Sequence, residues 1–253
     1  MKNRRSFIVG IKSFILLNNE KKFLKKYKPW GVILFSRNIK NINQTKKLTD
    51  SIRKIFKDDK YPILVDQEGG RVSRFDSMIS TTNFTADFFG KLYKNNFKKF
   101  KIYYRIFIDQ NCYLMNKLGI NINNVPVLDV KRNKFNNIIG DRSYSINPRV
   151  VSKIGDFCIK GFHKNNIGTV IKHIPGHGLT NVDSHSFTPK VSNKLRQLIK
   201  NDFFPFKKKS SFFAMTAHII YQDIDKDFTA THSSKVIKLI RNSIKFKNIL
   251  ISD

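Results

Sequence analysis

The sequence predicts an α/β protein of the (β/α)8 (TIM) barrel type that lacks the last βα unit. Short apolar runs rich in Val, Ile and Phe recur along the chain, as in parallel strands that are covered on both faces. Amphipathic helical stretches separate many of these runs, and this alternation is typical of a barrel or a doubly wound sheet. The predicted strands are residues 7–11, 31–35, 61–65, 120–130, 168–171, 212–216 and 248–251.

Three of the intervening helices can be identified from sequence signals. Asn147 is a predicted N-cap with Pro148 in the first turn, and Ser233-Ser234 precedes another helix. Gly119 and Gly168 are predicted at helix ends. Each helix carries one apolar stripe at helical spacing. The stripes are Leu48, Ile52, Ile55 and Phe56; Val151, Ile154, Phe157, Cys158 and Phe162; and Val236, Ile237, Ile240 and Ile244.

Polar residues at the predicted strand ends favour the barrel. A barrel collects its active site from the carboxyl ends of many strands, whereas a doubly wound sheet uses one crevice and a glycine-rich first turn. No G-x-G-x-x-G sequence and no P-loop is present. We expect a single domain over residues 1–253, with open edges because the seventh predicted strand is the last. The strand-end residues are Arg37, Asp66, Asp129, Lys172-His173, His218 and Asp253.

The chain is strongly basic. Its 253 residues carry 48 Lys and Arg against 18 Asp and Glu, a net charge of +30. This charge is typical of proteins that bind nucleic acid or an anionic membrane surface, but it also follows from a composition biased towards Lys, Asn, Ile and Phe. The basic residues are scattered along the chain, which favours compositional bias. Neither a nucleic-acid partner nor a membrane partner is therefore expected.

The sequence indicates a cytoplasmic protein. Cys112 and Cys158 are too few for a disulfide framework and favour a reducing compartment. No apolar run approaches the roughly 20 residues that span a bilayer. The basic N-terminus followed by an apolar stretch resembles a secretory signal, but Lys12 interrupts the stretch and no small-residue cleavage site follows. An opening strand is the favoured interpretation.

A histidine-rich segment is the first candidate site. The sequence KHIPGHG at residues 172–178 is followed by Asp183-Ser184-His185. A metal site is one interpretation, although Pro and Gly residues prevent the helix that would direct His173 and His177 at one ion. A Ser-His-Asp hydrolase is less favoured, because no G-x-S-x-G sequence is present. Alternatively, Asp183 orients His185 and raises its pKa, which suits an acid/base histidine, or the pair is a solvated loop without a role.

The second candidate site is residues 66–74, DQEGGRVSR. An acidic residue ends a buried strand, and a Gly-Gly turn returns two arginines towards it. Asp66 can accept hydrogen bonds from sugar-type hydroxyl groups, and Arg74 can hold an anionic or carbonyl oxygen. For Glu68 and Arg71 an ion pair that stabilises the turn is the favoured interpretation.

Together these segments resemble the motifs of family 3 glycoside hydrolases. The matches are DQEGGRVSRF at residues 66–75, GDRSY at 140–144, KHIPGHG at 172–178 and DSH at 183–185, with further support from GVILFSRN at 31–38, Ala217-His218 and Ile251-Ser252-Asp253. Within the family they most resemble the bacterial cytosolic β-N-acetylhexosaminidases of peptidoglycan recycling. The resemblance runs in order from about residue 8 to residue 253.

The resemblance implies a monomeric barrel that removes terminal N-acetylglucosamine from N-acetylglucosaminyl-anhydromuramyl peptides by a retaining mechanism, with no cofactor or metal. Asp253 matches the family's catalytic nucleophile, His185 its acid/base and Asp183 the partner of that histidine. Glu68 does not match the family's proton donor. The positions that contact the sugar are matched by Asp66, Arg74, Arg142, Lys172 and His173.

The sequence departs from the family after Asp253. Family members continue with a loop, a helix, an eighth strand and a closing helix, so we expect an open-edged product of low stability and reduced activity. A second hypothesis is an inactive barrel that binds polyanions through its positive charge. A third is a metal-dependent hydrolase that chelators would inactivate.

Overall fold

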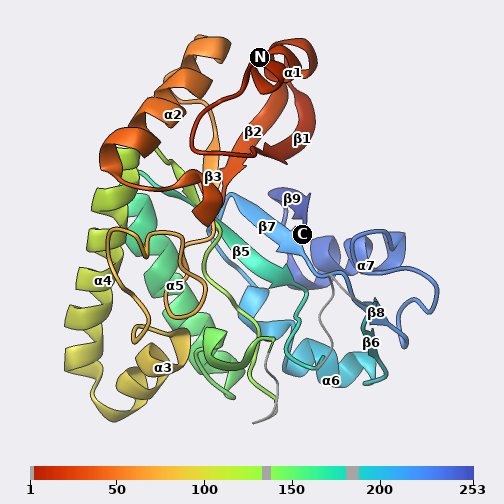
Figure 1. Ribbon diagram of the computed structural model, residues 1–253. Helices are drawn as coiled ribbons and strands as arrows, with labels where there is room; N and C mark the ends of the chain where they lie inside the picture. The colour runs from red at the N-terminus through yellow and green to blue at the C-terminus, as the bar shows by residue number, and fades with distance from the viewer. Residues whose placement is uncertain (1–2, 133–137, 181–187) are drawn as a thin grey trace.

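The computed structural model describes residues 3–132, 138–180 and 188–253. Seven parallel strands form one curled sheet in the order β1-β2-β3-β4-β5-β7-β9 (Figure 1). These strands are β1 (Arg5–Gly10), β2 (Pro29–Leu34), β3 (Ile63–Val65), β4 (Ile122–Asn123), β5 (Gly168–Ile174), β7 (Phe213–Thr216) and β9 (Ile249–Ser252). The predicted class is therefore confirmed: the sheet is a barrel that stays open between β1 and β9.

Helices cover the outer face of the sheet (Figure 1). The N-cap predicted at Asn147 is confirmed, and Ser233 caps the helix expected after Ser233-Ser234: each side chain accepts a hydrogen bond from the first turn of its helix. The helices are α1 (Asn18–Tyr27), α2 (Ile42–Phe56), α3 (Ala86–Asn95), α4 (Phe97–Leu118), α5 (Pro148–Lys164), α6 (Leu195–Lys200) and α7 (Ser234–Leu239), which continues as a π-helix over Ile240–Ile244. A small parallel pair, β6 (Lys190–Val191) and β8 (Ile220–Tyr221), lies outside the main sheet.

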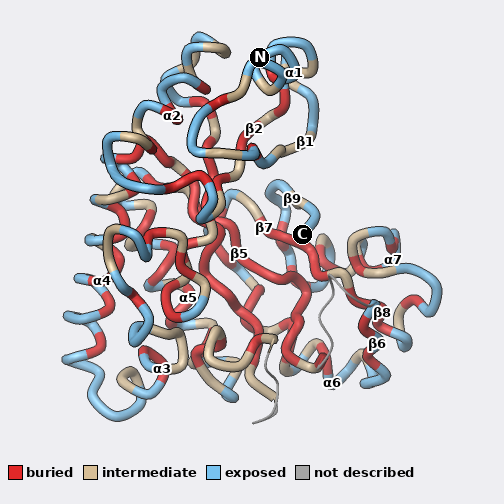
Figure 2. The backbone as a smooth tube through the Cα atoms, in the orientation of Figure 1, coloured by how far each residue is buried: buried red, intermediate tan, exposed pale blue. Residues whose placement is uncertain are grey.

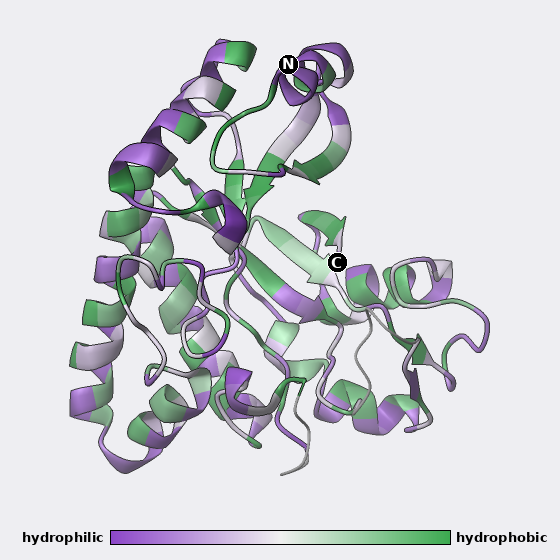
Figure 3. Cartoon of the chain, viewed as in Figure 1, coloured by the Kyte–Doolittle hydropathy of each residue, from purple (hydrophilic) through white to green (hydrophobic). Residues whose placement is uncertain are grey.

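Two apolar cores result. The larger lies between the sheet and its helices, and the smaller, inside the barrel, contains Leu64, Ile122, Val170 and Met215. Figure 2 shows the central strands buried, and Figure 3 shows the helices banded hydrophilic and hydrophobic, as expected for amphipathic helices. Among the described residues, no helix is long and apolar enough to cross a membrane.

Three local expectations were wrong. The strand predicted over residues 120–130 is only two residues long, because Pro126 has no N–H to donate to a neighbouring strand. Gly168 does not end a helix: α5 ends at Lys164, and Gly168 is the first residue of β5. Phe157 was placed on the buried stripe of α5 but is 39% exposed.

Candidate active site

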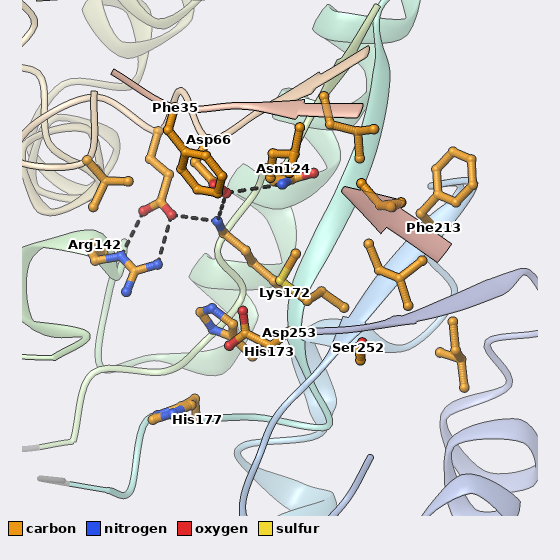
Figure 4. A pocket seen from close by; sticks show the side chains of 18 of the residues that line it. Phe35, Asp66, Asn124, Arg142, Lys172, His173, His177, Phe213, Ser252 and Asp253 are labelled. Atoms are coloured by element: carbon orange, nitrogen blue, oxygen red, sulfur yellow. Dashed lines mark hydrogen bonds and ion pairs between the residues drawn. The ribbon is translucent and has the colours of Figure 1, made fainter. Parts of the chain in front are cut away.

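A cavity of about 970 Å³ lies inside the open barrel. Its polar part is lined by Asp66, Glu68, Lys172 and His173, which follow or end strands β3 and β5 (Figure 4). Its apolar part is lined by residues of β1, β2, β7 and β9, among them Trp30 and Phe213. Parallel strands place their carboxyl ends at one edge, so residues distant in the sequence meet here.

Lys172 is the centre of the polar part. Its ammonium lies 2.8 Å from Asp66 Oδ1 and 2.7 Å from Glu68 Oε1, and its side chain is only 3% exposed. Asn124 donates a further hydrogen bond to Asp66 Oδ1, at 3.1 Å. Burial alone would lower the pKa of Lys172, but the two carboxylates raise it above its usual value. Lys172 is therefore charged at neutral pH.

Arg142 holds the other side of Glu68. It is the last residue of the 3₁₀ turn Gly140–Arg142, and its Nε and Nη2 each donate to one oxygen of Glu68 at 2.8 Å. Burial would raise the pKa of Glu68, but Lys172 and Arg142 hold it well below its usual range. Glu68 is therefore an ionised carboxylate that holds two cations in the cavity wall.

Arg74 also lines the cavity. Its backbone N–H donates to Gln67 Oε1 at 2.7 Å, which fixes the turn after β3. Its guanidinium Nε is buried and finds no hydrogen-bond partner among the described residues. A buried N–H without a partner is costly.

His173 and His177 lie on the loop side of the cavity (Figure 4). His173 Nδ1 is 2.6 Å from Asp129 Oδ2, and the rings of the two histidines are 5.4 Å apart. Burial, together with the charge of His173, lowers the pKa of His177 to about 4. His177 is therefore neutral at neutral pH.

Asp253 follows β9 and also lines the cavity (Figure 4). Its main-chain oxygen lies 2.9 Å from His218 Nε2, and Thr231 Oγ1 lies 2.8 Å from His218 Nδ1. This arrangement joins the ends of β7 and β9.

The cavity thus brings together six of the eight predicted site residues: Asp66, Arg74, Arg142, Lys172, His173 and Asp253. Asp183 and His185 lie outside the described residues. The ion pair expected between Glu68 and Arg71 was wrong: Glu68 pairs with Arg142 and Lys172, and Arg71 pairs with Asp141 at 2.9 Å.

Two contributors were missed as site residues, Asn124 and Asp129. The position of Asp129 at a predicted strand end points to the site, but the sequence does not indicate its partner. Asn124 comes directly after the short strand β4, which the sequence did not delimit.

The sequence matches the Glycosyl hydrolase family 3 N terminal domain over residues 11–253. A Beta-hexosaminidase of Neisseria meningitidis serogroup A is 31% identical over 99% of this chain and 70% of its own length. Beta-hexosaminidase A of Pseudoalteromonas piscicida is 32% identical over 91% of this chain. This chain spans 41% of that relative's length.

Solved structures give the same assignment. Native NagZ from Neisseria gonorrhoeae superposes with a TM-score of 0.90 at 29% identity, covering 99% of this chain and 73% of that chain. A family 3 β-N-acetylglucosaminidase from Paenibacillus superposes with a TM-score of 0.86 at 28% identity, covering 98% of this chain and 47% of that chain. The chain therefore belongs to the family described by the glycosyl hydrolase family 3 N-terminal domain.

Proposed function

We propose that this protein is a retaining β-N-acetylglucosaminidase. The observation that carries the proposal is the convergence of Asp66, Lys172, His173 and Asp253 on one cavity at the carboxyl ends of the strands. The relatives named Beta-hexosaminidase support it, as does a NagZ structure from Neisseria gonorrhoeae in complex with N-trifluoroacetyl-D-glucosamine, which superposes with a TM-score of 0.90.

The polar wall supplies the groups that bind a sugar. Asp66 is an acceptor for hydroxyl groups, because Lys172 holds its pKa below the usual value although burial would raise it. Lys172 and Arg142 supply donors, and the guanidinium of Arg74 lines the same cavity. Ionised groups fixed by one another before the sugar arrives need no reorganisation on binding.

Asp253 and His185 carry out the chemistry in this proposal. The Asp253 carboxylate attacks the anomeric carbon, the glycosidic C–O bond breaks, and the leaving oxygen takes a proton from His185. His185 then takes a proton from water, whose oxygen displaces Asp253 from the anomeric carbon. Asp183 orients the imidazole of His185. Glu68 stays ionised throughout and holds Lys172 and Arg142 in place.

The proposed substrates are N-acetylglucosaminyl-anhydromuramyl peptides in the cytoplasm, and the proposed working form is a monomeric single domain over residues 1–253. Arg71, Arg74 and Arg142 all line the cavity. Arg142 is paired with Glu68 and Arg71 with Asp141, so Arg74 is the cation that suits a carboxylate of an anhydromuramyl peptide.

Hydrolysis of a chromogenic β-N-acetylglucosaminide tests the proposal. We expect Asp253→Asn to abolish turnover of this substrate, and His185→Ala to lower turnover of an alkyl β-N-acetylglucosaminide, whose leaving group needs protonation, about 10²- to 10⁴-fold, the range for removal of a general acid/base. Asp223→Asn is the matched control, because Asp223 pairs with an exposed lysine outside the cavity. Hydrolysis that survives both catalytic changes contradicts the proposal. Nucleic-acid binding that falls steeply with salt, without hydrolysis, supports a polyanion-binding protein instead.

A further inference from the structure

A fully buried carboxylate, Asp129, lies behind the cavity wall and accepts three hydrogen bonds. Asp129 Oδ2 is 2.6 Å from His173 Nδ1, Oδ1 accepts from the main-chain N–H of His177 at 2.6 Å, and a longer contact of 3.3 Å joins Oδ1 to the N–H of His173. All three contacts are made to the end of β5 and the loop after it. One carboxylate thus holds both the ring of His173 and the backbone that carries His177.

The loop reaches Asp129 because it has no side chain at Gly178. A Cβ at this position would lie 1.9 Å from the carbonyl oxygen of Val130, the residue after Asp129. The close approach of these two backbones brings the N–H of His177 within hydrogen-bond distance. The packing of the loop and the hydrogen bonds of Asp129 therefore support each other.

The charge state of Asp129 determines which ring nitrogen of His173 carries a proton. Burial alone would raise the pKa of Asp129, but His173 and His177 lower it below its usual value. An ionised carboxylate only accepts hydrogen bonds, so the proton between the two groups belongs to His173 Nδ1. The other nitrogen, Nε2, is then left for the cavity that His173 lines.

Asp202 provides a natural comparison. It is also buried and also ionisable, but its carboxylate pairs with Arg132, at 2.9 Å and 3.1 Å. Burial would raise the pKa of both carboxylates; His173 and the main-chain N–H of His177 lower that of Asp129, whereas Arg132 acts on Asp202. Asp202 therefore forms an ion pair with an arginine, whereas Asp129 contacts a histidine ring in the cavity wall.

We propose that Asp129 is a positioning residue that fixes His173 with Nδ1–H turned inward and Nε2 presented to the sugar. The contact between Nε2 and the sugar rests on the proposed function, whereas the orientation of the His173 ring does not. In metal sites, removing a carboxylate that orients a histidine in this way lowers metal affinity or activity about 10- to 100-fold. We expect a loss in this range for the binding of N-acetylglucosamine when the carboxylate is removed.

Nitrogen-15 NMR of the wild-type protein tests the ring directly. We expect His173 Nδ1 to show the chemical shift of a protonated ring nitrogen and its coupling to hydrogen, with His173→Gln used to assign the signals. A spectrum with a bare Nδ1 overturns the proposal. This measurement needs no Asp129 variant, so it stands even where Asp129→Asn fails to fold.

Calorimetric titration with N-acetylglucosamine tests the consequence. We expect Asp129→Asn to weaken binding about 10- to 100-fold and to shift the His173 tautomer, while the matched control Asp202→Asn changes neither. Equal effects of the two variants, or an unchanged tautomer in Asp129→Asn, overturn the proposal. One result separates the two parts of the proposal. If Asp129→Asn shifts the tautomer but His173→Gln binds the sugar as wild type does, Asp129 positions the ring and the sugar contact proposed for His173 is wrong.

Discussion

Replacing Lys172 with Met removes the cation at the centre of the polar wall. Lys172 lies within 2.8 Å of both Asp66 and Glu68 and is 3% exposed. Without it, the two buried carboxylates lose a positive charge that balances their negative charges. Removing one partner of a buried ion pair costs about 3–5 kcal/mol. Arg142 still neutralises Glu68, and Asn124 still donates to Asp66. We therefore expect the lower end of that range, about 3 kcal/mol of unfolding free energy.

Guanidinium unfolding at pH 7, followed by the fluorescence of the single tryptophan, measures this loss. Lys194→Met is the matched control, because Lys194 also pairs with an aspartate but is 78% exposed. Exposed pairs contribute at most about 1 kcal/mol. A loss for Lys172→Met no larger than for Lys194→Met would refute the reasoning. Adding Asp66→Asn to Lys172→Met should recover part of the loss, because Asp66 is the carboxylate that loses its cation and keeps only the hydrogen bond from Asn124.

Three further predictions concern stability and reactivity. The pKa of Glu68 is lower in the folded protein than its usual value of about 4.3, so ionised Glu68 stabilises the fold above that pH, and this contribution is lost as the pH falls below it. The free energy of unfolding, measured from pH 7 down to pH 3, should therefore decrease. In Glu68→Gln this decrease should be smaller. Gly90→Ala should destabilise α3 by about 1–3 kcal/mol or more in thermal melts, because the new Cβ would lie 1.6 Å from the carbonyl oxygen of Tyr144. Gly161→Ala, whose Cβ meets only a side chain, should cost less. Burial raises the pKa of the Cys158 thiol to about 12. Thiol reagents should therefore label Cys158 only when the protein unfolds. Rapid labelling of Cys158 in the folded protein at pH 8 would contradict this prediction.

The sequence predicted the positions of the strands well, because each buried parallel strand is a continuous apolar run. All seven predicted runs overlap a strand of the sheet, and the N-cap Asn147 was identified from local chemistry alone. Strand ends were less predictable. The apolar run over residues 120–130 continues past β4, because Pro126 interrupts the strand, and pairing with β5 resumes only as an isolated bridge between Val127 and Lys172.

Site residues were predictable where a motif named them, and their partners were not. Lys172 and Arg142 were identified as sugar-contacting positions, but nothing in the sequence indicates that Glu68 joins them. Lys172 lies on β5 and Arg142 in a 3₁₀ turn, and both are distant in the chain from Glu68, which follows β3. Local reasoning favoured Arg71, three residues from Glu68, whereas the structure pairs Glu68 with Arg142, 74 residues away.

The identity of the proton donor gives one more prediction. A glycosidase with two nearby carboxylates usually uses one as the acid, but Glu68 has a lowered pKa and cannot carry a proton at neutral pH. If Glu68 only holds Lys172 and Arg142, Glu68→Gln should lower turnover by the same factor for substrates with good and with poor leaving groups. His185→Ala should mainly affect poor leaving groups, because only these require protonation as the bond breaks. Parallel assays of an aryl and an alkyl β-N-acetylglucosaminide separate the two residues. A Glu68→Gln defect confined to the alkyl substrate would make Glu68 the acid and remove His185 from that role.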